Sequence, residues 1–424
     1  MEKKQHKKGL FWQHLCTIVS LVCCSCAPQS GKAQSPDSGR YLSPVFQSIE
    51  TTHGIAFSSA TATGATSPSS LFLDFYEPAG DTLAARPLVI TVFGGGFVTG
   101  SRDASDMVAY CERLAHHGYT AAAIDYRLLP LFSLSRKAFI REAYMASQDV
   151  SAAVRFFKAN SSIYGIDTSR IFLLGNSAGS IAILHEMFLT EDERPPETFE
   201  SPNLGPLHQS GSPSHFPYSP KVNAAILHWG GVIDLHIIDP EDYVPLCMIH
   251  GTNDNIVHYD SGYCFSSITS IMMPFMYGSH SIAHHLDTLG IQDYELHPFE
   301  GEGHCFYISG INTLVESKFN ACFNITKAFL YQRMTSSPTA VPVREEPRIT
   351  IYPTPAHDHL RVELPGAGIA RVVLHDLFGR VVQTSVTAGE TAVISVEGIP
   401  QGIYFLTVTD TDGRSIVRKV TVGR

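Results

Sequence analysis

The sequence predicts an α/β fold, a mostly parallel sheet with helices on both faces, followed by a small all-β sandwich. Between residues 41 and 335, apolar runs of strand length alternate with stretches of helical periodicity, the pattern of a parallel sheet with crossover helices. Over residues 348–424, apolar and polar residues alternate in short segments between Gly, Asp and Pro turns, which is typical of a sandwich. Residues 336–347 lack periodicity, and we interpret them as a linker.

The N-terminal segment, residues 1–27, has the layout of an export signal. A basic stretch precedes an apolar run and then small residues, and a polar leader follows at residues 28–40. The apolar run is shorter than the ~20 residues that a membrane-spanning helix needs. We therefore expect a cleaved signal and no stable transmembrane segment in the mature form. A lipidated Cys24 or Cys26 and a retained anchor helix are the alternatives.

The expected elements of the first domain follow in order along the chain. Ser105 is the expected N-cap of a helix over residues 105–119, and Gly118 is its expected stop. A long amphipathic helix is expected over residues 138–165. The expected strands are residues 70–78, 86–93, 120–130, 170–175, 222–229 and 245–251. The right-handed crossovers between them bring the carboxyl ends of the parallel strands to one edge, where sites in open α/β sheets are built.

Two stretches interrupt this alternation. Residues 190–220 are rich in Pro and Ser and longer than an ordinary connection, so they are a candidate lid or substrate-facing loop. Residues 264–278 (CFSSITSIMMPFMYG) are apolar and rich in Met. They are expected either to line an acyl pocket or to form a core helix.

The net charge of −10 argues against nucleic acid as a partner, because phosphate binding needs a basic face. Five cysteines remain behind the predicted signal, an odd number for an oxidising compartment. The sequence leaves one or two disulfides and their connectivity open, and it places Cys111 and Cys247 in apolar, core-like patterns. The five are Cys111, Cys247, Cys264, Cys305 and Cys322.

A Gly-x-Ser-x-Gly turn, GNSAG, joins a buried strand to a helix and makes Ser177 the candidate nucleophile. Such a turn strains the serine backbone, and side chains at Gly175 and Gly179 would collide with neighbouring backbone. An ordinary strand-to-helix turn is the alternative for a motif this short. A second glycine run, FGGGF, follows the strand at residues 86–93, and its amides can approach a substrate oxygen.

Three backbone amides are therefore the expected oxyanion hole: those of Gly95, Gly96 and Ala178. A phosphate-binding loop is the alternative for the glycine run, but the Gly-Lys-Ser/Thr ending that phosphate requires is missing.

The candidate acid and base lie after two later strands. Asp254 is in a polar turn directly after residues 245–251, where a carboxylate can hold the tautomer of an imidazole. His304 is in a glycine-flanked loop after the next strand, so the order is nucleophile, acid, base. Asp260 is the competitor for the acid, but it lies further from the end of the strand. His258 and His297 are the competitors for the base, and neither lies on such a turn.

These motifs resemble those of α/β-hydrolases of the carboxylesterase and lipase group, including hormone-sensitive-lipase-like enzymes. The resemblance spans about Leu71 to Met334 and rests on GGGF, GNSAG, DYRLLP, IYGIDTSRIFLLG and HGTNDNIVHY. It implies a serine carboxylic-ester hydrolase with a Ser177–His304–Asp254 triad, a covalent acyl-enzyme, no cofactor and no metal. Phe93 departs from the pattern, because many relatives have histidine before the glycines.

The C-terminal domain resembles the type A sorting domain of the type IX secretion system. The segments that carry the resemblance are IYPTPAHDHLRVEL, VVLHDLFGRVV and GIPQGIYFLTVTDTDGRSIVRKVTV, with Thr354 where the pattern usually has Asn. The resemblance implies export, with release from the cell or attachment to its surface, and the secretion machinery as partner. A generic β-sandwich binding module is the alternative.

Small-molecule or lipid esters are the expected substrates. A secreted peptidase of the prolyl-oligopeptidase type and a non-catalytic surface adhesin on a hydrolase fold are the alternatives. Histidine clusters at His116, His284 and His357 are interpreted as solvated surface, because no carboxylate or cysteine pattern accompanies them.

Overall fold

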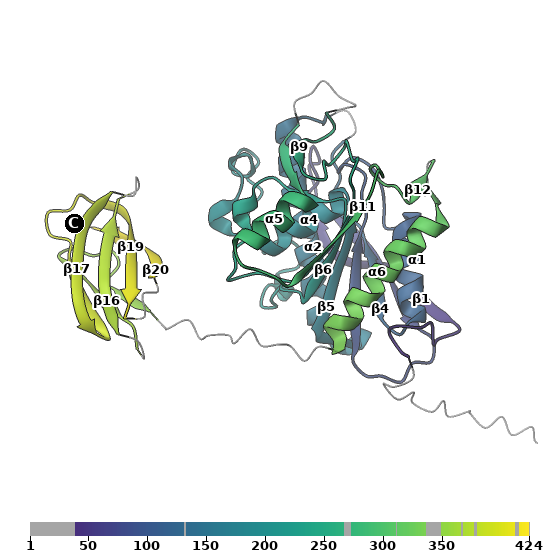
Figure 1. Cartoon of the computed structure of the whole chain (residues 1–424), viewed down its shortest axis with the longest axis horizontal. Coiled ribbons are helices and arrows are strands. Elements are labelled where there is room, and N and C mark those ends of the chain that lie inside the picture. Colours follow the sequence, from purple (N-terminus) through teal and green to yellow (C-terminus); the bar gives the residue numbers. More distant parts are fainter. Residues whose placement is uncertain are drawn as a thin grey trace, which may run out of the picture. The chain divides into compact units, whose positions relative to one another are not determined.

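The computed structural model describes the chain from residue 39 to residue 423, with gaps at residues 131–132, 267–272, 311, 336–348, 366–367, 377–379 and 412–414. The chain divides into two compact units, Met1–Phe329 and Leu330–Arg424 (Figure 1). The expected signal at residues 1–27, most of the leader and the linker at residues 336–347 lie outside the described residues. The domain limits drawn from the sequence therefore stay predictions.

The first unit is built on an eight-stranded sheet with the strand order β1-β2-β4-β3-β5-β6-β8-β11. The pairs β1–β2 and β2–β4 are antiparallel, and every other pair is parallel, as expected from the alternation of strands and helices. The strands are β1 (Ile49–Ala60), β2 (Ser69–Pro78), β3 (Arg86–Val92), β4 (Thr120–Ile124), β5 (Ile166–Asn176), β6 (Ala224–His228), β8 (Leu246–Gly251) and β11 (Tyr294–Phe299).

Helices cover both faces of this sheet. Figure 1 shows α1 and α6 on one face and α2, α4 and α5 on the other. Rings of Tyr110 in α1 and Phe319 in α6 pack with centroids 4.8 Å apart. The helices are α1 (Ser105–His116), α2 (Arg136–Ala159), α3 (Ser161–Tyr164), α4 (Ala178–Phe188), α5 (Ser279–Thr288) and α6 (Glu316–Thr335).

The two ends of α1 give one correction and one confirmation. Ala104, not Ser105, is the N-cap, and no side chain caps the helix. The Ser105 hydroxyl instead donates to the carbonyl of Asn312 at 2.8 Å, so a contact with a distant segment replaces the expected cap. Gly118 ends the helical path at φ 96°, a conformation that favours glycine, as predicted.

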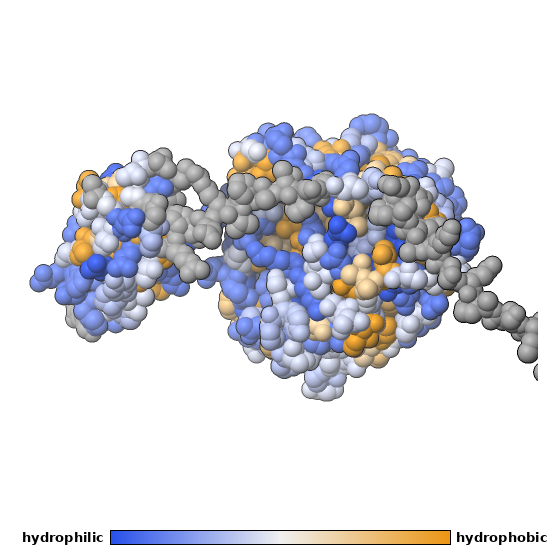
Figure 2. All heavy atoms as spheres, turned by 90° about the horizontal axis from the view of Figure 1, so that it is seen from below, coloured by the Kyte–Doolittle hydropathy of each residue, from blue (hydrophilic) through white to orange (hydrophobic). Residues whose placement is uncertain are grey.

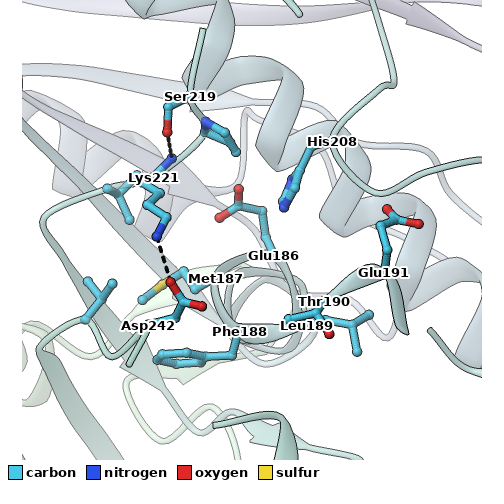
Figure 3. A pocket seen from close by; sticks show the side chains of 13 residues that line it. Glu186, Met187, Phe188, Leu189, Thr190, Glu191, His208, Ser219, Lys221 and Asp242 are labelled. Carbon is cyan, nitrogen blue, oxygen red and sulfur yellow. Dashed lines mark hydrogen bonds and ion pairs between the residues drawn. The ribbon is translucent and has the colours of Figure 1, made fainter. Parts of the chain in front are cut away.

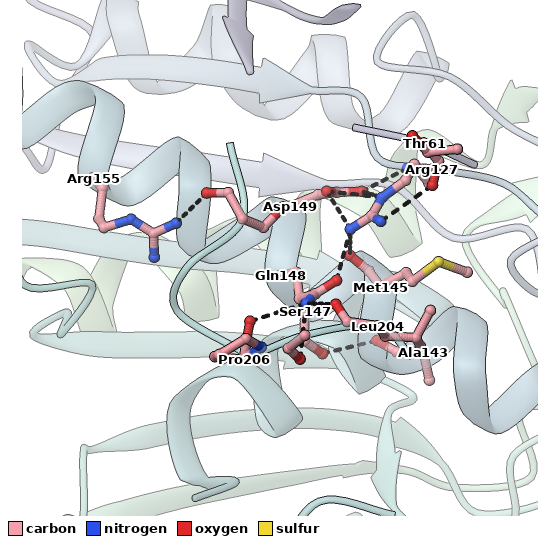
Figure 4. A network of polar contacts seen from close by, with 12 residues as sticks. Thr61, Arg127, Ala143, Met145, Ser147, Gln148, Asp149, Arg155, Leu204 and Pro206 are labelled. Atoms are coloured by element: carbon pink, nitrogen blue, oxygen red, sulfur yellow. Dashed lines mark hydrogen bonds and ion pairs between the residues drawn. The ribbon is translucent and has the colours of Figure 1, made fainter. Parts of the chain in front are cut away.

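The excursion at residues 190–220 packs along α2, with short 3₁₀ turns at Glu191–Glu193, Pro196–Thr198 and Pro213–His215. Figure 4 shows how Gln148 of α2 donates to the carbonyls of Leu204 and Pro206, at 2.9 and 3.0 Å. The same region of α2 binds Arg127, whose guanidinium and amide pair with buried Asp149.

The excursion and α2 cover each other. The central part of α2 is buried on nearly all sides, polar residues included, because the excursion covers the face that would otherwise meet water. The excursion itself is tied to α2 by the hydrogen bonds of Gln148, and a role as a lid or substrate-facing loop stays a prediction.

The described part of the Met-rich stretch includes one short strand, Phe275–Gly278, and the choice between a pocket lining and a core helix falls partly on residues outside it. Strands β9 (Ser261–Tyr263) and β10 (Phe275–Gly278) pair with each other, and β10 also pairs with β7 (Gly231–Val232). Met273 and Met276 are buried, and residues 267–272 lie outside the described part. The remaining small elements are the 3₁₀ turn at Leu235–Ile237 and the pair β12 (Ile308–Ser309) with β13 (Thr313–Leu314).

The second unit is all-β, as predicted. Its two sheets have the strand orders β14-β15-β18 and β17-β16-β19-β20. Both sheets contribute to one core, which includes Leu360, Val362, Val372 and Leu406. The strands are β14 (Thr350–Tyr352), β15 (His359–Glu363), β16 (Ile369–His375), β17 (Val381–Gly389), β18 (Thr391–Ser395), β19 (Gly402–Asp410) and β20 (Ser415–Val422).

On the face in Figure 2, hydrophilic residues cover most of the surface and hydrophobic residues form separate patches. All five described cysteines are free thiols, and Cys111 and Cys247 are buried in the core as predicted. Among the described residues, no helix combines the length and the apolar character that crossing a bilayer requires.

Candidate active site

Ser177 lies at the junction of β5 and α4 in a strained backbone conformation, φ 48° and ψ −118°. The turn around it is too tight for side chains on its glycines. A Cβ on Gly179 would lie 2.1 Å from the carbonyl oxygen of Val92, and one on Gly175 would lie 2.8 Å from the backbone of Gly179. The predicted need for glycine at both positions is confirmed, and its effect is to raise the serine hydroxyl above the carboxyl edge of the sheet.

The structure brings the three predicted side chains together at this edge. The Oγ of Ser177 lies 2.8 Å from Nε2 of His304, and Nδ1 of His304 lies 2.6 Å from Oδ2 of Asp254. The three residues follow β5, β8 and β11, which are neighbours or near neighbours in the parallel part of the sheet. This is an unbroken chain of hydrogen bonds from a hydroxyl through an imidazole to a carboxylate.

Asp254 is buried, yet its carboxylate is fully hydrogen-bonded. Its Oδ1 accepts the amides of Ile256 and Val257 at 2.8 and 3.1 Å. Its Oδ2 lies near His304 and, at 3.2 Å, near Nε2 of His250. Burial alone would raise the pKa of Asp254, but the hydrogen bonds from His250 and His304 outweigh it and hold the pKa well below its usual range. The carboxylate therefore stays charged.

His304 has opposing influences on its charge. Burial lowers the pKa of the imidazole, whereas the neighbouring Cys305 sulfur and the Asp254 carboxylate raise it, and the net shift is upward. The ring of buried Trp229 lies edge-on to His304 with centroids 6.0 Å apart. That aromatic wall limits the directions in which the imidazole can turn.

The glycine loop after β3 lies against the nucleophile. A Cβ on Gly94 would stand 3.1 Å from Cβ of Ser177. Gly95 has φ 117° and accepts amides of Val98 and Thr99 on its carbonyl, while Gly96 has φ 62°. In the described part of the chain, the amides of Gly95, Gly96 and Ala178 donate no hydrogen bond. They are therefore available to an oxygen bound beside Ser177.

Three aromatic rings pack around this loop: those of Phe93, Tyr126 and Phe265. Phe93 is buried and stacks on Tyr126 with centroids 4.3 Å apart. The Tyr126 hydroxyl donates to the carbonyl of Phe93 at 3.0 Å. The ring of Phe265 closes the other side, since its Cζ lies 3.2 Å from where a Cβ on Gly96 would stand.

A buried polar network, which the sequence patterns did not predict, lies beneath the nucleophile. Asn176, which precedes Ser177, donates through its side-chain amide to Asp106. Tyr307 connects Asp106 to Nδ1 of His228, whose carbonyl accepts the Ser177 amide at 2.9 Å. Burial raises the pKa of Asp106 to about 6 and lowers that of His228 to about 3. Apart from Asn176, which lies in the GNSAG turn, no local motif marks these residues, because the network forms only when distant elements pack.

His250 was also missed, although it lies in the segment that supplied Asp254. The available signal was its position four residues before that carboxylate, directly before the glycine that ends β8.

The competing residues lie elsewhere. Asp260 is exposed and binds Ser281 and His280, and His258 lies near Ser266. His297 pairs with Glu295 at 2.8 Å, and with Cys247 these two form the one described trio whose ligand atoms lie within 4.8 Å of one another. Two of these three side chains, Glu295 and His297, are already hydrogen-bonded to each other, which explains their proximity.

A separate cavity of about 320 Å³ lies at the other end of α4 (Figure 3). The carboxyl of Glu186 and the ring of His208 point into it, and Lys221 pairs with Asp242 at 2.7 Å along its wall. Burial raises the pKa of Glu186 to about 8, against the attraction of Arg155 and Lys158. Since α4 has eleven residues at a rise of ~1.5 Å each, this cavity is far from Ser177.

Comparison with known proteins adds two family matches. Residues 73–242 match the BD-FAE model, and residues 350–423 match the model described as a secretion system C-terminal sorting domain. A probable isoprenylcysteine alpha-carbonyl methylesterase of Oryza sativa subsp. japonica is 29% identical over 136 residues, which are 31% of this chain and 29% of that protein. Lipase 2 of Geotrichum candidum is 25% identical over 139 residues, 32% of this chain and 25% of the lipase.

The chain thus spans less than a third of the length of these curated relatives. Among solved structures, esterase 2 of Thermogutta terrifontis phosphorylated by paraoxon is 22% identical, with a TM-score of 0.45 over 69% of this chain and 97% of that chain.

Proposed function

We propose that this chain, an α/β-hydrolase that carries a secretion system C-terminal sorting domain, is a secreted serine carboxylic-ester hydrolase. The observation that carries the proposal is the chain of hydrogen bonds from Ser177 through His304 to Asp254, at 2.8 and 2.6 Å. This arrangement is the one that activates a serine hydroxyl as a nucleophile. The similarity to a methylesterase and to a lipase supports an ester as the substrate.

In the first half-reaction, the Oγ of Ser177 attacks the ester carbonyl carbon while its proton passes to Nε2 of His304. Asp254 accepts the Nδ1–H of the imidazolium and stabilises its charge. The tetrahedral intermediate then collapses, His304 protonates the leaving alcohol oxygen, and an acyl ester of Ser177 remains. Water repeats the sequence with His304 as base, releasing the acid and restoring the hydroxyl.

The amides of Gly95, Gly96 and Ala178 bind the oxygen on which negative charge develops. Their availability and the contact of the glycine loop with Ser177 support this role. Ala178 is the first residue of α4, so the helix N-terminus adds its partial positive charge. Each well-placed donor contributes roughly 3–4 kcal/mol to the transition state.

Export is the second part of the proposal. The match to the sorting domain supports passage through the type IX system, with release or attachment at the cell surface. The basic and apolar layout of residues 1–27 supports a signal for the first membrane. The secretion machinery is accordingly the expected partner, and small-molecule or lipid esters are the expected substrates.

The test compares wild-type protein with Ser177→Ala on a panel of p-nitrophenyl esters and, in parallel, on aminoacyl-naphthylamides. Wild type should hydrolyse esters, and Ser177→Ala should lose at least about 10⁴-fold in kcat. Ser219→Ala, at the remote cavity, is the matched control and should keep wild-type turnover. Preferential cleavage of the amides would favour the alternative hypothesis of a peptidase. Undiminished ester turnover by Ser177→Ala would show that Ser177 is not the nucleophile.

A further inference from the structure

His250 is a second histidine in contact with the carboxylate of Asp254. Its side chain is completely buried near the end of β8, and both ring nitrogens have partners. Nδ1 lies 2.9 Å from the hydroxyl of Ser279, the first residue of α5. Nε2 lies 2.9 Å from the carbonyl oxygen of Val257 and 3.2 Å from Oδ2 of Asp254.

These partners determine where the proton of His250 is. A backbone carbonyl and an ionised carboxylate can only accept, so Nε2 must carry the proton and donate to both. On the opposite side of the ring, Nδ1 forms a hydrogen bond with the Ser279 hydroxyl at 2.9 Å. The ring of His250 is therefore held by groups from two other segments: the turn that contains Asp254 and Val257, and α5.

The carboxylate of Asp254 accepts four hydrogen bonds on its two oxygens. Two backbone amides fix Oδ1, while His250 and His304 share Oδ2. Within the described residues, His250 is the only side chain besides His304 that donates to this carboxylate. Without His250, Oδ2 loses the contact that opposes the pull of His304.

We propose that His250 is a positioning residue of the triad, which holds Oδ2 of Asp254 in the place that His304 requires and takes up part of its negative charge. This inference rests on the proposed ester hydrolysis. It follows from the sharing of one carboxylate oxygen by two imidazoles, and it goes beyond the three residues of the triad itself.

The inference has two measurable consequences. A carboxylate that turns by a few tenths of an ångström misplaces the imidazole, and such misplacement lowers kcat on the order of tenfold to a hundredfold while leaving KM unchanged. A carboxylate that has lost a donor also attracts the His304 proton more strongly, so the acid limb of kcat/KM moves to higher pH. The other titratable groups nearby are Cys305 beside His304 and Tyr259, whose ring packs against His250 at 5.6 Å.

The experiment compares four proteins in full-length form: wild type, His250→Ala, His250→Gln and Ser279→Ala. Glutamine keeps an N–H donor for Asp254 but removes the acceptor for Ser279, and Ser279→Ala removes only that remote contact. We expect His250→Ala to lose kcat and to shift its acid limb upward. His250→Gln and Ser279→Ala should remain within about threefold of wild type. Should His250→Ala fail to fold, His250→Asn, whose amide is too short to reach Asp254, replaces it.

A double-mutant cycle separates positioning from general stability. In an Asp254→Ala background, His250→Ala should cause no further loss, because His250 acts only through that carboxylate. An equal loss in both backgrounds, equal losses for the Ala and Gln variants, or an unchanged His250→Ala would each overturn the inference.

The rate of Ser177 labelling by a fluorophosphonate gives the same comparison without depending on the ester chosen. Wild-type protein inactive toward all esters would refute the proposed function. Active wild-type protein with a fully active His250→Ala variant would refute only this inference.

Discussion

Two buried carboxyl groups, one near each end of α4, have pKa values shifted in opposite directions. Near the N-terminal end, Asp254 is linked through His304 to Ser177 and accepts hydrogen bonds on both oxygens. At the C-terminal end, Glu186 faces a cavity (Figure 3), and its pKa is raised to about 8. At neutral pH, Asp254 is charged and Glu186 is mostly uncharged.

Burial raises the pKa of both groups, so burial cannot explain the difference. Asp254 has four short-range donors, two of them backbone amides that cannot turn away. For Glu186, only the attraction of Arg155 and Lys158 and a hydrogen bond with Ser151 oppose the rise in pKa that burial causes. A buried carboxylate remains ionised where donors are built around it, and a triad requires such a carboxylate.

The largest predicted effect comes from replacing each carboxyl by its amide. Asp254→Asn should lower kcat roughly 10³–10⁴-fold, because an amide cannot accept from both imidazoles and no longer stabilises the imidazolium. Glu186→Gln should leave kcat within about twofold of wild type, since it is remote from Ser177. Steady-state kinetics with a p-nitrophenyl ester measures both, with the melting temperature as the folding control. Similar losses in the two variants would remove the distinction between the two ends of α4.

The second prediction concerns the pH dependence of activity. His304 must be unprotonated to accept the Ser177 proton, and the net shift of its pKa is upward from 6.5. Therefore kcat/KM should fall on acidification with a midpoint above pH 6.5, at least about tenfold between the plateau and pH 5.5. A stopped assay across pH 5–10 with a pH-stable ester measures this. A midpoint below 6 would mean that Cys305 and Asp254 do not raise the proton affinity of His304.

The smallest effect concerns stability, and its sign distinguishes the two carboxyl groups. Because the pKa of Glu186 is raised when folded, its contribution is fully present below the unfolded value of 4.5 and is lost as the pH rises toward about 8. Glu186→Gln should thus gain stability relative to wild type by up to about 1.4 kcal/mol per pH unit across that window.

Urea unfolding at pH 5 and pH 8 measures the gain. The depressed pKa of Asp254 gives the opposite dependence, with stability that is present above 3.8 and lost on acidification below it. A constant difference between Glu186→Gln and wild type at both pH values would contradict the raised pKa of Glu186.

The sequence predicted most of the fold and the three residues of the candidate triad. The resemblances to esterases and lipases and to a sorting domain are confirmed by the family matches at residues 73–242 and 350–423. Ser177 and its glycines were recognisable because strained turns restrict residue type locally. The catalytic roles of Ser177, His304 and Asp254, and those of the three amides, stay predictions.

What the sequence did not predict depends on packing between distant segments. The excursion at residues 190–220 has no periodicity, so its hydrogen bonds to Gln148 could not be foreseen. Ser105 has the residue type of a cap, yet its hydroxyl donates to the carbonyl of Asn312, which lies 207 residues further along the chain. His250 opens the HGTNDNIVHY segment, but its contacts with Asp254 and Ser279 form only when the turn and α5 pack around it.

The most direct test of the account is the site of covalent modification. Purified protein is treated with a fluorophosphonate, and peptide mass spectrometry locates the adduct and its stoichiometry. The account predicts one adduct per chain, on Ser177, with labelling strongly slowed in His304→Ala and unchanged in Ser219→Ala. Full esterase activity with Ser177 unmodified, or an adduct on another residue that abolishes activity, would contradict it.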